Sequence, residues 1–483
     1  MHLGRREPSN MKRAIPARWL AHACRVLALG VIGVAPALAD VVGKDGKIHV
    51  TYWEKWVSFE GIAMQATIDA FNASQDKIVV DYYPTSQVDR KVLVATAGGD
   101  PPDVAGLWVQ NIATFADANA LMPLDDFIRE DGMTSEEWLA RYYPAFAHIC
   151  TYRGQVFAGI STPAVIALHW NKTLFREAGL DPEKPPRTVA ELDEFARKLT
   201  KRDPKTGRLV QMGFLPQEPG WWPWIFARWF GGELFDGERV TIGTDPRNLE
   251  ALRWVASYTH EYGRDDVRTF ASGFSGHALN AQSGFMNGKV AMVFQGVWFD
   301  NYIRQYKPGL DYGVGPWPEA VPGVSDFAMT EADVLVIPRG AKNPRAAWEF
   351  IKFANSHNPQ ARTREELSGI ELTCFLQAKS SPLRAWSPFF GKNHPHPYIG
   401  IFRELSASPH AVSVPQMGIW QEYNREFMLV FEQTRLALAK PEEAIAYCQK
   451  RMSASWARYQ KSLIRHGQVA ASTDAREKTE DAR

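Results

Sequence analysis

Tryptophan is concentrated at positions in this sequence where binding chemistry is expected. The 483 residues include 17 Trp, 15 Tyr and 26 Phe. An indole ring buries a large apolar area and presents an electron-rich face, which suits the C–H face of a pyranose ring. Carboxylates and amides nearby would hydrogen-bond the hydroxyl groups. The candidate binding residues are Trp53, Glu54, Trp56, Trp108, Asn111, Glu218, Trp221, Trp222, Trp298 and Trp420.

Several of these tryptophans follow segments that the residue pattern predicts to be strands. Trp53, Trp108 and Trp298 lie at or just after the ends of such segments. In open parallel α/β sheets, ligands bind beyond the carboxyl ends of the strands. We therefore expect these rings at a binding site. The tryptophans on helical apolar stripes are expected in the core instead, and these are Trp138, Trp254, Trp348 and Trp456.

Known catalytic motifs are incomplete in this chain. No phosphate-binding G-x-x-x-x-G-K-[ST] loop occurs, and Gly273-Phe274-Ser275-Gly276-His277 lacks the final glycine of a nucleophile elbow. His260-Glu261 begins like a zinc-protease helix, but Arg264 stands where the second ligand is needed. The pair His394 and His396 flanks a proline and is expected in a solvated loop. We therefore predict no catalytic residue, no metal and no cofactor.

The first residues have the pattern of a secretory leader. Residues 1–25 are basic, residues 26–39 are uncharged, and Ala37-Leu38-Ala39 is an A-x-A cleavage site. The uncharged stretch is shorter than the roughly 20 residues that span a bilayer. We interpret 1–39 as a signal peptide, with translation starting at Met1 or at Met11, and expect a periplasmic protein. The alternative is a buried N-terminal helix.

Charge and cysteine content narrow the function classes further. The 55 basic residues against 54 acidic ones give a net charge of +1, which does not favour nucleic-acid binding. Three cysteines follow the leader. One disulfide between two of them is possible, and the sequence does not indicate which pair would form it. Cys448 lies on an apolar helical stripe and is expected as a buried thiol. The three are Cys150, Cys374 and Cys448.

Strand-like and helix-like segments alternate along the chain. The apolar pattern predicts strands over 48–53, 78–83, 102–107, 290–294 and 334–337. Helices are expected between these strands and in the second half of the chain. One of them begins at Thr188-Val189-Ala190-Glu191, which forms a capping box. This alternation is typical of α/β proteins with parallel βαβ units. No long linker separates the two α/β halves, so we expect two lobes joined by short crossing strands.

A set of short motifs in order resembles one known family. The chain is similar to the extracellular solute-binding proteins, family 1, of ATP-binding cassette importers, the sugar-binding class related to maltose-binding protein. The resemblance covers about residues 45–465. The motifs are Ala97–Val104, Leu121–Asp125, His169–Leu180, Pro185–Thr188, Phe285–Met292, Val336–Gly340 and Ala347–Phe350.

The resemblance implies an α/β fold of two periplasmic-binding-protein lobes, type II-like, each a mostly parallel sheet flanked by helices and joined by a hinge with multiple crossovers. The first lobe would comprise 40–160 and 323–375, the second 161–322 and 376–465, with a polar, disordered tail over 466–483. The implied protein is a monomer that captures a sugar, polyol or glycoside in its cleft and delivers it to a membrane permease. The alternatives are a secreted carbohydrate-active enzyme, such as a glycosidase or lyase, and an adhesion or scaffold protein.

The resemblance also assigns roles to single residues. Trp298 and Trp420 look like the two stacking tryptophans of the family, and Glu218 with Trp221 and Trp222 looks like its acidic and aromatic sugar contacts. The sequence departs from the family at Ala164, about where maltose binders keep a carboxylate, and over 375–398. These departures affect the identity of the sugar that the resemblance implies, and not the class of protein.

Overall fold

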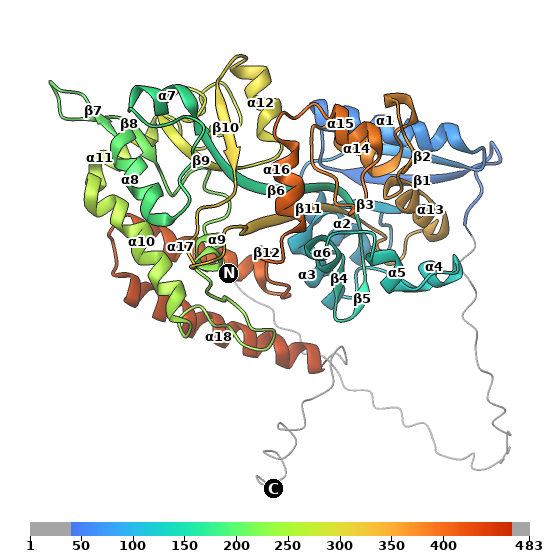
Figure 1. Cartoon of the computed structure of the whole chain (residues 1–483). Helices are drawn as coiled ribbons and strands as arrows, with labels where there is room; N and C mark the ends of the chain where they lie inside the picture. Colours follow the sequence, from blue (N-terminus) through green and yellow to red (C-terminus); the bar gives the residue numbers. More distant parts are fainter. Residues whose placement is uncertain (1–39, 466–483) are drawn as a thin grey trace, which may run out of the picture. The chain divides into compact units, whose positions relative to one another are not determined.

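One mixed β-sheet connects the strands of the protein. The computed structural model describes residues 40–465, and the proposed leader and tail lie outside this range (Figure 1). The sheet has ten strands, eight of them along one path. In path order they are β2 (Ile78–Pro84), β1 (Ile48–Glu54), β3 (Val104–Trp108), β11 (Ala328–Val336), β6 (Gly159–Asn171), β9 (Val290–Gly296), β8 (Leu209–Phe214) and β7 (Lys201–Arg202).

Two further strands pair with the middle of this path. β10 (Tyr312–Gly315) is antiparallel to β6, and β12 (Ala411–Val412) is parallel to β11. β4 (Thr151–Tyr152) and β5 (Gln155–Val156) form a separate hairpin. β1 is parallel to both of its neighbours, as β8 is to β9, whereas β6 and β11 run antiparallel to each other.

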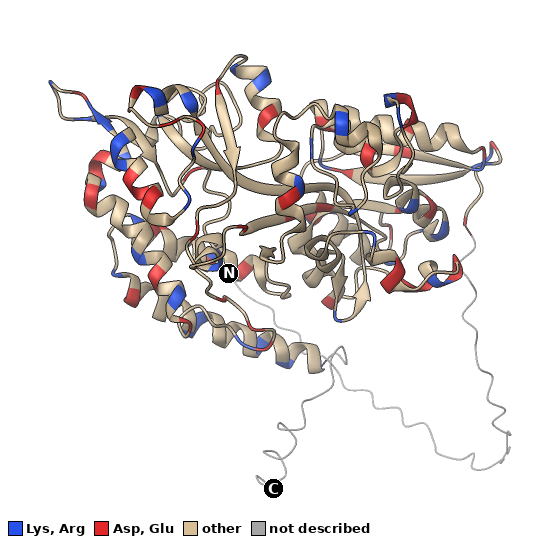
Figure 2. Cartoon of the chain, in the orientation of Figure 1, with Lys and Arg blue, Asp and Glu red and all other residues tan. Residues whose placement is uncertain are grey.

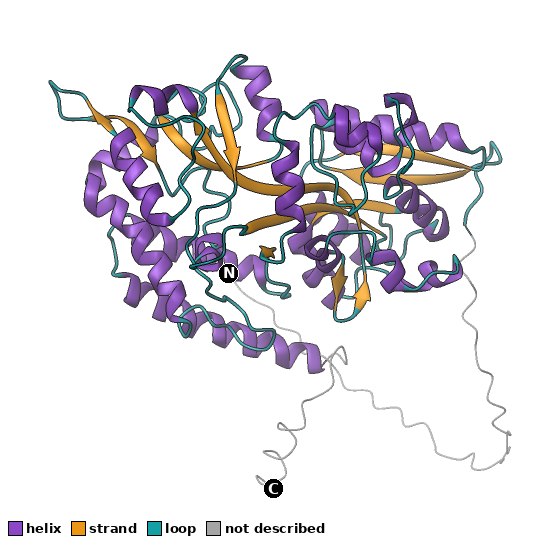
Figure 3. Ribbon diagram, in the orientation of Figure 1, coloured by secondary structure: helices purple, strands orange, loops and turns teal. Residues whose placement is uncertain are grey.

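The first lobe is built around β1, β2 and β3, with helices flanking the strands (Figure 3). Apolar residues of β1 and of two helices, such as Val50, Met64, Ile68 and Ile351, form its core. Its helices are α1 (Ser58–Ser74), α2 (Val88–Ala97), α3 (Ile112–Asp117), α4 (Asp125–Glu130), α5 (Ser135–Leu139), α6 (Pro144–Ile149), α13 (Pro344–Ala354) and α14 (Gly369–Leu376).

The second lobe is built around β8 and β9. Phe214, Trp229 and Trp254 pack within its aromatic core. Its helices are α7 (Lys172–Glu177), α8 (Val189–Leu199), α9 (Ile225–Trp229), α10 (Pro246–Tyr262), α11 (Arg264–Ser272), α12 (Phe299–Tyr306), α17 (Trp420–Arg435) and α18 (Pro441–Arg465). Two more, α15 (Pro388–Asn393) and α16 (Ile399–Ala407), precede α17, and α16 packs on β6 and β11.

The strands β6 and β11 connect the two lobes. The first half of β6 pairs with β11, and its second half pairs with β9 and β10. β11 pairs with β3 through its C-terminal residues, and its register to β6 shifts between Asp333 and Val334. The α/β fold of two lobes with several crossings is therefore confirmed. The expected boundaries between the lobes at residues 160, 322 and 375 stay a prediction. Residues 377–384, which follow the last of these boundaries, contact α1 and the segment between α5 and α6, which belong to the first lobe.

The local sequence signals mark the ends of helices and strands as expected, with two differences. Asp245 caps α10, and Gly263 ends it at φ +88°, where glycine is favoured. Thr188 caps α8 by accepting from the Glu191 N–H, but the Glu191 carboxylate accepts from Arg187 and so does not complete a capping box. The expected strand at 334–337 is the end of β11, which begins six residues earlier.

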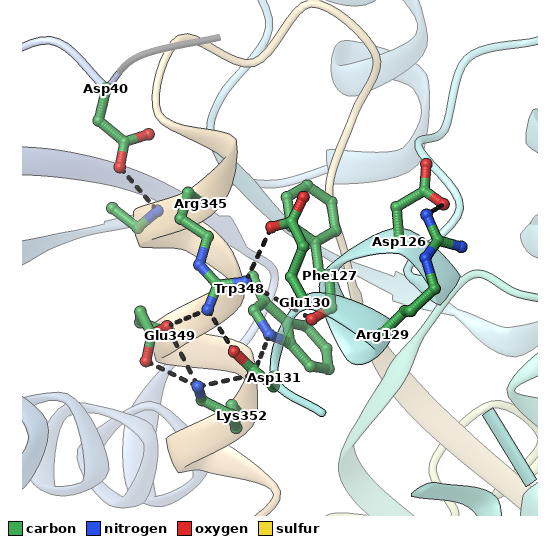
Figure 4. A network of polar contacts seen from close by, with 11 residues as sticks. Asp40, Asp126, Phe127, Arg129, Glu130, Asp131, Arg345, Trp348, Glu349 and Lys352 are labelled. Carbon is green, nitrogen blue, oxygen red and sulfur yellow. Dashed lines mark hydrogen bonds and ion pairs between the residues drawn. The ribbon is translucent and has the colours of Figure 1, made fainter. Parts of the chain in front are cut away.

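A polar network fixes α13 against α4 in the first lobe (Figure 4). Asp131 accepts hydrogen bonds from Arg345, from Trp348 Nε1 at 2.8 Å and from Lys352 Nζ at 2.7 Å. Burial opposes ionisation of Asp131, but these three donors outweigh it and lower its pKa to about 2. Asp40 accepts from the Ala346 N–H at the start of α13.

The tryptophans expected in the core are buried there. Trp138 and Trp348 are fully buried and pack with ring centroids 4.9 Å apart. Trp254 and Trp456 are buried in the second lobe. Cys150, Cys374 and Cys448 are buried free thiols.

Charged residues of both signs are interspersed over the helices of both lobes (Figure 2). No helix between residues 40 and 465 is long and apolar enough to cross a bilayer.

Candidate functional site

A cavity of about 460 Å³ lies along the crossing strands. Its floor is formed by Thr162 and Ala164 of β6 and by Glu331, Ala332 and Asp333 of β11. Its volume falls in the range of small-molecule sites. The walls come from both lobes and comprise Trp56, Glu60, Trp108, Gln110, Trp221, Trp222, Trp224, Leu279, Trp298, Tyr302, Lys379, Val414, Trp420, Gln421 and Asn424.

Aromatic rings line the cavity from both sides. Trp56 and Trp108 belong to the first lobe, after β1 and at the end of β3. On the other side the Trp298 ring lies 5.9 Å from Trp222 and 6.5 Å from Trp221, centroid to centroid. Trp108 and Trp221 are the most accessible of these rings, at 36% and 40%. Flat apolar faces are therefore available on opposing walls.

The strand end at Gly296 positions the Trp298 ring. β9 ends at Gly296, and α12 begins at Phe299, so Trp298 lies in a sharp turn between strand and helix. A Cβ atom on Gly296 would lie 2.3 Å from the Trp298 ring, which is closer than real contacts allow. The glycine therefore lets the indole lie directly against the strand end.

Two indole N–H groups at the cavity have no hydrogen-bond partner among the described residues. They are Nε1 of Trp56 and Nε1 of Trp298, and both are buried. Buried polar groups in proteins are nearly always hydrogen-bonded. These two N–H groups are therefore unsatisfied donors on residues that line the cavity.

An ion-pair network lies beside the floor of the cavity. Lys55 Nζ is 3.1 Å from Asp333 Oδ1 and 3.1 Å from Glu54 Oε1. The Thr162 hydroxyl donates to the other oxygen of Asp333. Lys55 also lies over the rings of Trp56 and Trp108, 4.8 Å and 4.9 Å from their centroids. Asp333 is therefore held in place by both crossing strands and by the segment after β1.

A second ion pair lies at the contact between the lobes. Lys379 Nζ is 2.8 Å from Glu60 Oε1 on α1, and it lies over Trp56 and Trp298 at 5.1 Å and 5.9 Å from the ring centroids. Nearby, the Phe59 ring contacts Tyr302 of α12 at 5.6 Å. The two lobes thus contact each other at this edge of the cavity.

Glu331 differs from the other acidic residues of the cavity because no cation pairs with it. It pairs in register with Ala164, the position where the resemblance would place a carboxylate. Burial, and secondly the charge of Asp333, raise its pKa to about 8, against a hydrogen bond from Trp222. Glu331 is therefore largely protonated at neutral pH.

Six of the ten residues proposed from sequence line this cavity. They are Trp56, Trp108, Trp221, Trp222, Trp298 and Trp420.

The other four are not among its lining residues. Trp53 packs partly buried against the core. Glu54 is fully buried beneath Lys55, over Gly106, where it accepts from Tyr52. Asn111 is buried and accepts from Gln421, a wall residue.

Glu218 lies behind the Trp222 loop, in a separate small pocket with Phe226 and Phe294. Its burial raises its pKa to about 7, opposed by the charge of Arg435.

Local sequence patterns did not predict most of the polar residues that line the cavity. Glu331 and Asp333 alternate on a strand, which is a signal for one polar face, but the expected strand began only at Val334. Glu60, Tyr302 and Lys379 carry no local signal, because distant segments bring them to the cavity.

No group of three or more His, Cys, Asp or Glu side chains placed to hold a metal occurs within residues 40–465. The expected solvated loop at His394 and His396 is wrong, because His396 is buried and burial lowers the pKa of His394 to about 4. His394 Nε2 lies 3.2 Å from the carbonyl oxygen of Lys379.

Comparison with known proteins gives consistent relatives. Residues 58–361 match the family model described as bacterial extracellular solute-binding protein. The chain is 23% identical over 322 residues to the maltotriose-binding protein of Pyrococcus abyssi, covering 65% of this chain and 64% of that protein. It is 25% identical over 316 residues to the sn-glycerol-3-phosphate-binding periplasmic protein UgpB of Escherichia coli, covering 63% and 66%. The chain thus spans just under two thirds of the length of these curated relatives.

A solved structure extends the similarity over nearly the whole fold. CpMnBP1 with mannotriose bound superposes with a TM-score of 0.70 at 28% identity, covering 84% of this chain and 99% of that chain.

Proposed function

Because the chain belongs to the family of bacterial extracellular solute-binding proteins, we propose that it is the substrate-binding component of an ATP-binding cassette importer. It captures a sugar, or a related polyol or glycoside, in the cavity between the lobes and delivers it to membrane permease subunits. It acts as a monomer in the periplasm after removal of residues 1–39. Family members are binding proteins rather than enzymes, and we propose the same for this chain.

The convergence of tryptophan rings from both lobes on one cavity carries the proposal. Trp56 and Trp108 on one wall face Trp221, Trp222 and Trp298 on the other. A sugar ring placed between them would bury its C–H faces on indoles and its hydroxyl groups against the carboxylates and unpartnered N–H groups. Its relatives include a protein named for binding maltotriose and a solved structure with mannotriose bound.

The crossing strands support a hinge mechanism. Contacts to both walls at once exist only when the lobes are closed, so a ligand that makes them shifts the equilibrium toward closure. Periplasmic binding proteins are a standard example of such hinge closure. A preference of about 10⁴-fold for the closed form would move its population from 1% to 99%. The permease then reads the closed surface.

The enzymatic alternative gains no support from the described residues or the relatives. Two carboxylates of the cavity are already held in ion pairs, Asp333 with Lys55 and Glu60 with Lys379. A glycosidase needs one carboxylic acid and one carboxylate free to act across the scissile bond. A chromogenic glycoside that is turned over by the purified protein would favour that alternative.

Ligand titration tests the proposal. The purified protein is titrated with a panel that includes maltotriose and mannotriose, followed by tryptophan fluorescence and calorimetry. We expect at least one sugar, polyol or glycoside to bind and to raise the melting temperature, since a ligand at 100 times its Kd stabilises the fold by about 2.7 kcal/mol. No binding by any member of the panel would refute the proposal.

The Trp221→Ala variant tests the location of the site. The exposed Trp221 ring can be removed with little effect on the core, and we expect affinity to fall about 5- to 30-fold, or about 1–2 kcal/mol. Tyr447→Ala is the matched control, because Tyr447 is an exposed aromatic residue on α18 outside the cavity. Equal affinities of both variants would exclude Trp221 from the site.

A further inference from the structure

The charged groups that line the cavity are mostly acidic. Glu60, Glu331 and Asp333 contribute three carboxylates, and Lys379 contributes one ammonium group. With all four ionised, the lining carries a net charge of −2. No arginine is among the lining residues in the described part of the chain.

Both lysines at the cavity are already neutralised by buried partners. Lys379 is 4% exposed and pairs with Glu60, while Lys55 is 6% exposed and lies between Glu54 and Asp333. Taking a buried cation from its partner leaves an uncompensated buried carboxylate, which is strongly unfavourable. Neither ammonium group is therefore available to an anionic ligand.

Glu331 adds a carboxyl group that lacks any cationic partner. It is two residues before Asp333 on β11, so both side chains lie on the same face of the strand, toward the cavity. The charge of Asp333 acts on it directly, and the other ionisable residues of the lining are Glu60, Tyr302 and Lys379. Whether protonated or ionised, Glu331 provides no positive charge, and its ionised form would repel an anion.

The aromatic walls are equally unsuited to an anion. The face of an indole ring carries negative electrostatic potential, and the rings of Trp221, Trp222 and Trp298 lie together on one wall of the cavity. The unpartnered donors Trp56 Nε1 and Trp298 Nε1 are neutral, and neutral donors match hydroxyl oxygens. The relatives include both a sugar binder and a glycerol-phosphate binder, and the charges of this cavity fit the first.

We propose that the cavity takes an uncharged glycan and excludes solutes that carry a phosphate or carboxylate group, because neither of its lysines is free to pair with an anion, and that the ionised form of Glu331 strengthens this exclusion above neutral pH. The inference rests on the proposed function, because it concerns the ligand of the same site. Glu331 is the residue that makes the exclusion depend on pH, because its carboxyl group has no cationic partner in the lining and its ionised form leaves an uncompensated negative charge there.

Calorimetry with charge-matched ligand pairs tests the inference. The probes are maltotriose, mannotriose and mannose for the neutral class, mannose 6-phosphate and sn-glycerol 3-phosphate for the anions, and glucosamine against glucose for a cation. Each is measured at about pH 7 and at about pH 8.5 with wild type, Glu331→Gln and Glu443→Gln. Glu443 is an exposed residue of α18 without an ion pair, so Glu443→Gln is the matched control.

For wild type we expect neutral sugars to bind at least tenfold more tightly than phosphorylated solutes. In Glu331→Gln this ratio should shrink at least threefold at about pH 8.5, where wild-type Glu331 is ionised, and in Glu443→Gln it should stay the same. A ratio at about pH 8.5 that is the same in Glu331→Gln as in wild type would overturn the role of Glu331.

Tight binding of a phosphorylated solute, or tighter binding of glucosamine than of glucose, would overturn the selection for uncharged ligands while leaving the proposed function intact. Failure of every probe would refute the proposed function, and this inference would fall with it.

Discussion

The unpaired carboxyl group of Glu331 should make the stability of the protein depend on pH. Its pKa rises from an ordinary 4.5 to about 8 because of burial and the nearby charge of Asp333. In the unfolded chain the pKa returns to its ordinary value. The folded state therefore binds one more proton than the unfolded state between about pH 4.5 and pH 8. Stability that is present below pH 4.5 is lost as the pH rises through this window.

The size of this loss follows from the pKa shift. One pKa unit corresponds to about 1.4 kcal/mol, so the full shift would amount to about 5 kcal/mol. The carboxyl group borders an open cavity, where solvent reduces such effects, and we expect about 2–3 kcal/mol. Glu331→Gln keeps the shape of the side chain and removes the titration. The variant should therefore gain stability relative to wild type as the pH rises from about 5 to 8.5.

Urea unfolding at several pH values between 5 and 8.5 measures this difference. Glu443→Gln serves again as the control, and its curve should run parallel to that of wild type. If the midpoints of Glu331→Gln and wild type also change in parallel across this range, Glu331 is not held protonated in the folded protein, and the reasoning from its burial is wrong.

Three further predictions concern the geometry around the cavity and the core. Gly296→Ala should displace the Trp298 ring and lower sugar affinity at least tenfold by calorimetry, whereas Gly400→Ala, whose added Cβ meets open space, should not. Tyr459→Phe removes a 2.7 Å hydrogen bond to the buried Asp117 between α18 and α3 and should lower the free energy of unfolding by about 1–2 kcal/mol; an unchanged urea midpoint would contradict this. A chain beginning at residue 40 should not react with Ellman's reagent when native and should show three thiols when unfolded, because its cysteines are buried and free, namely Cys150, Cys374 and Cys448.

The sequence predicted those parts of the site that depend on local pattern. Strand ends are visible in the alternation of apolar residues, so Trp108 could be placed at the end of β3 and Trp298 just beyond β9 from the sequence alone. Helical stripes separated the core tryptophans such as Trp138 from those that line the cavity. Both predictions use only the spacing of apolar residues, which differs between strands and helices.

The polar half of the site depends on contacts between distant segments. Lys379 reaches Glu60 across 319 positions of the chain, and no local pattern indicates such a pairing. Glu54 was expected to contact the ligand because it follows Trp53 at a strand end. The structure instead places Glu54 under Lys55, where it helps to hold the cation that positions Asp333.

The floor of the cavity and the connection between the lobes are the same two strands. Thr162 of β6 and Asp333 of β11 are directly opposite each other and hydrogen-bonded, and the register of the pair shifts immediately after Asp333. A ligand group that hydrogen-bonds there contacts the strands whose twist must change when the lobes move. Ligand contacts at the hinge and ligand contacts at the walls then both favour the closed form. The preference for the closed form therefore does not depend on the aromatic contacts alone.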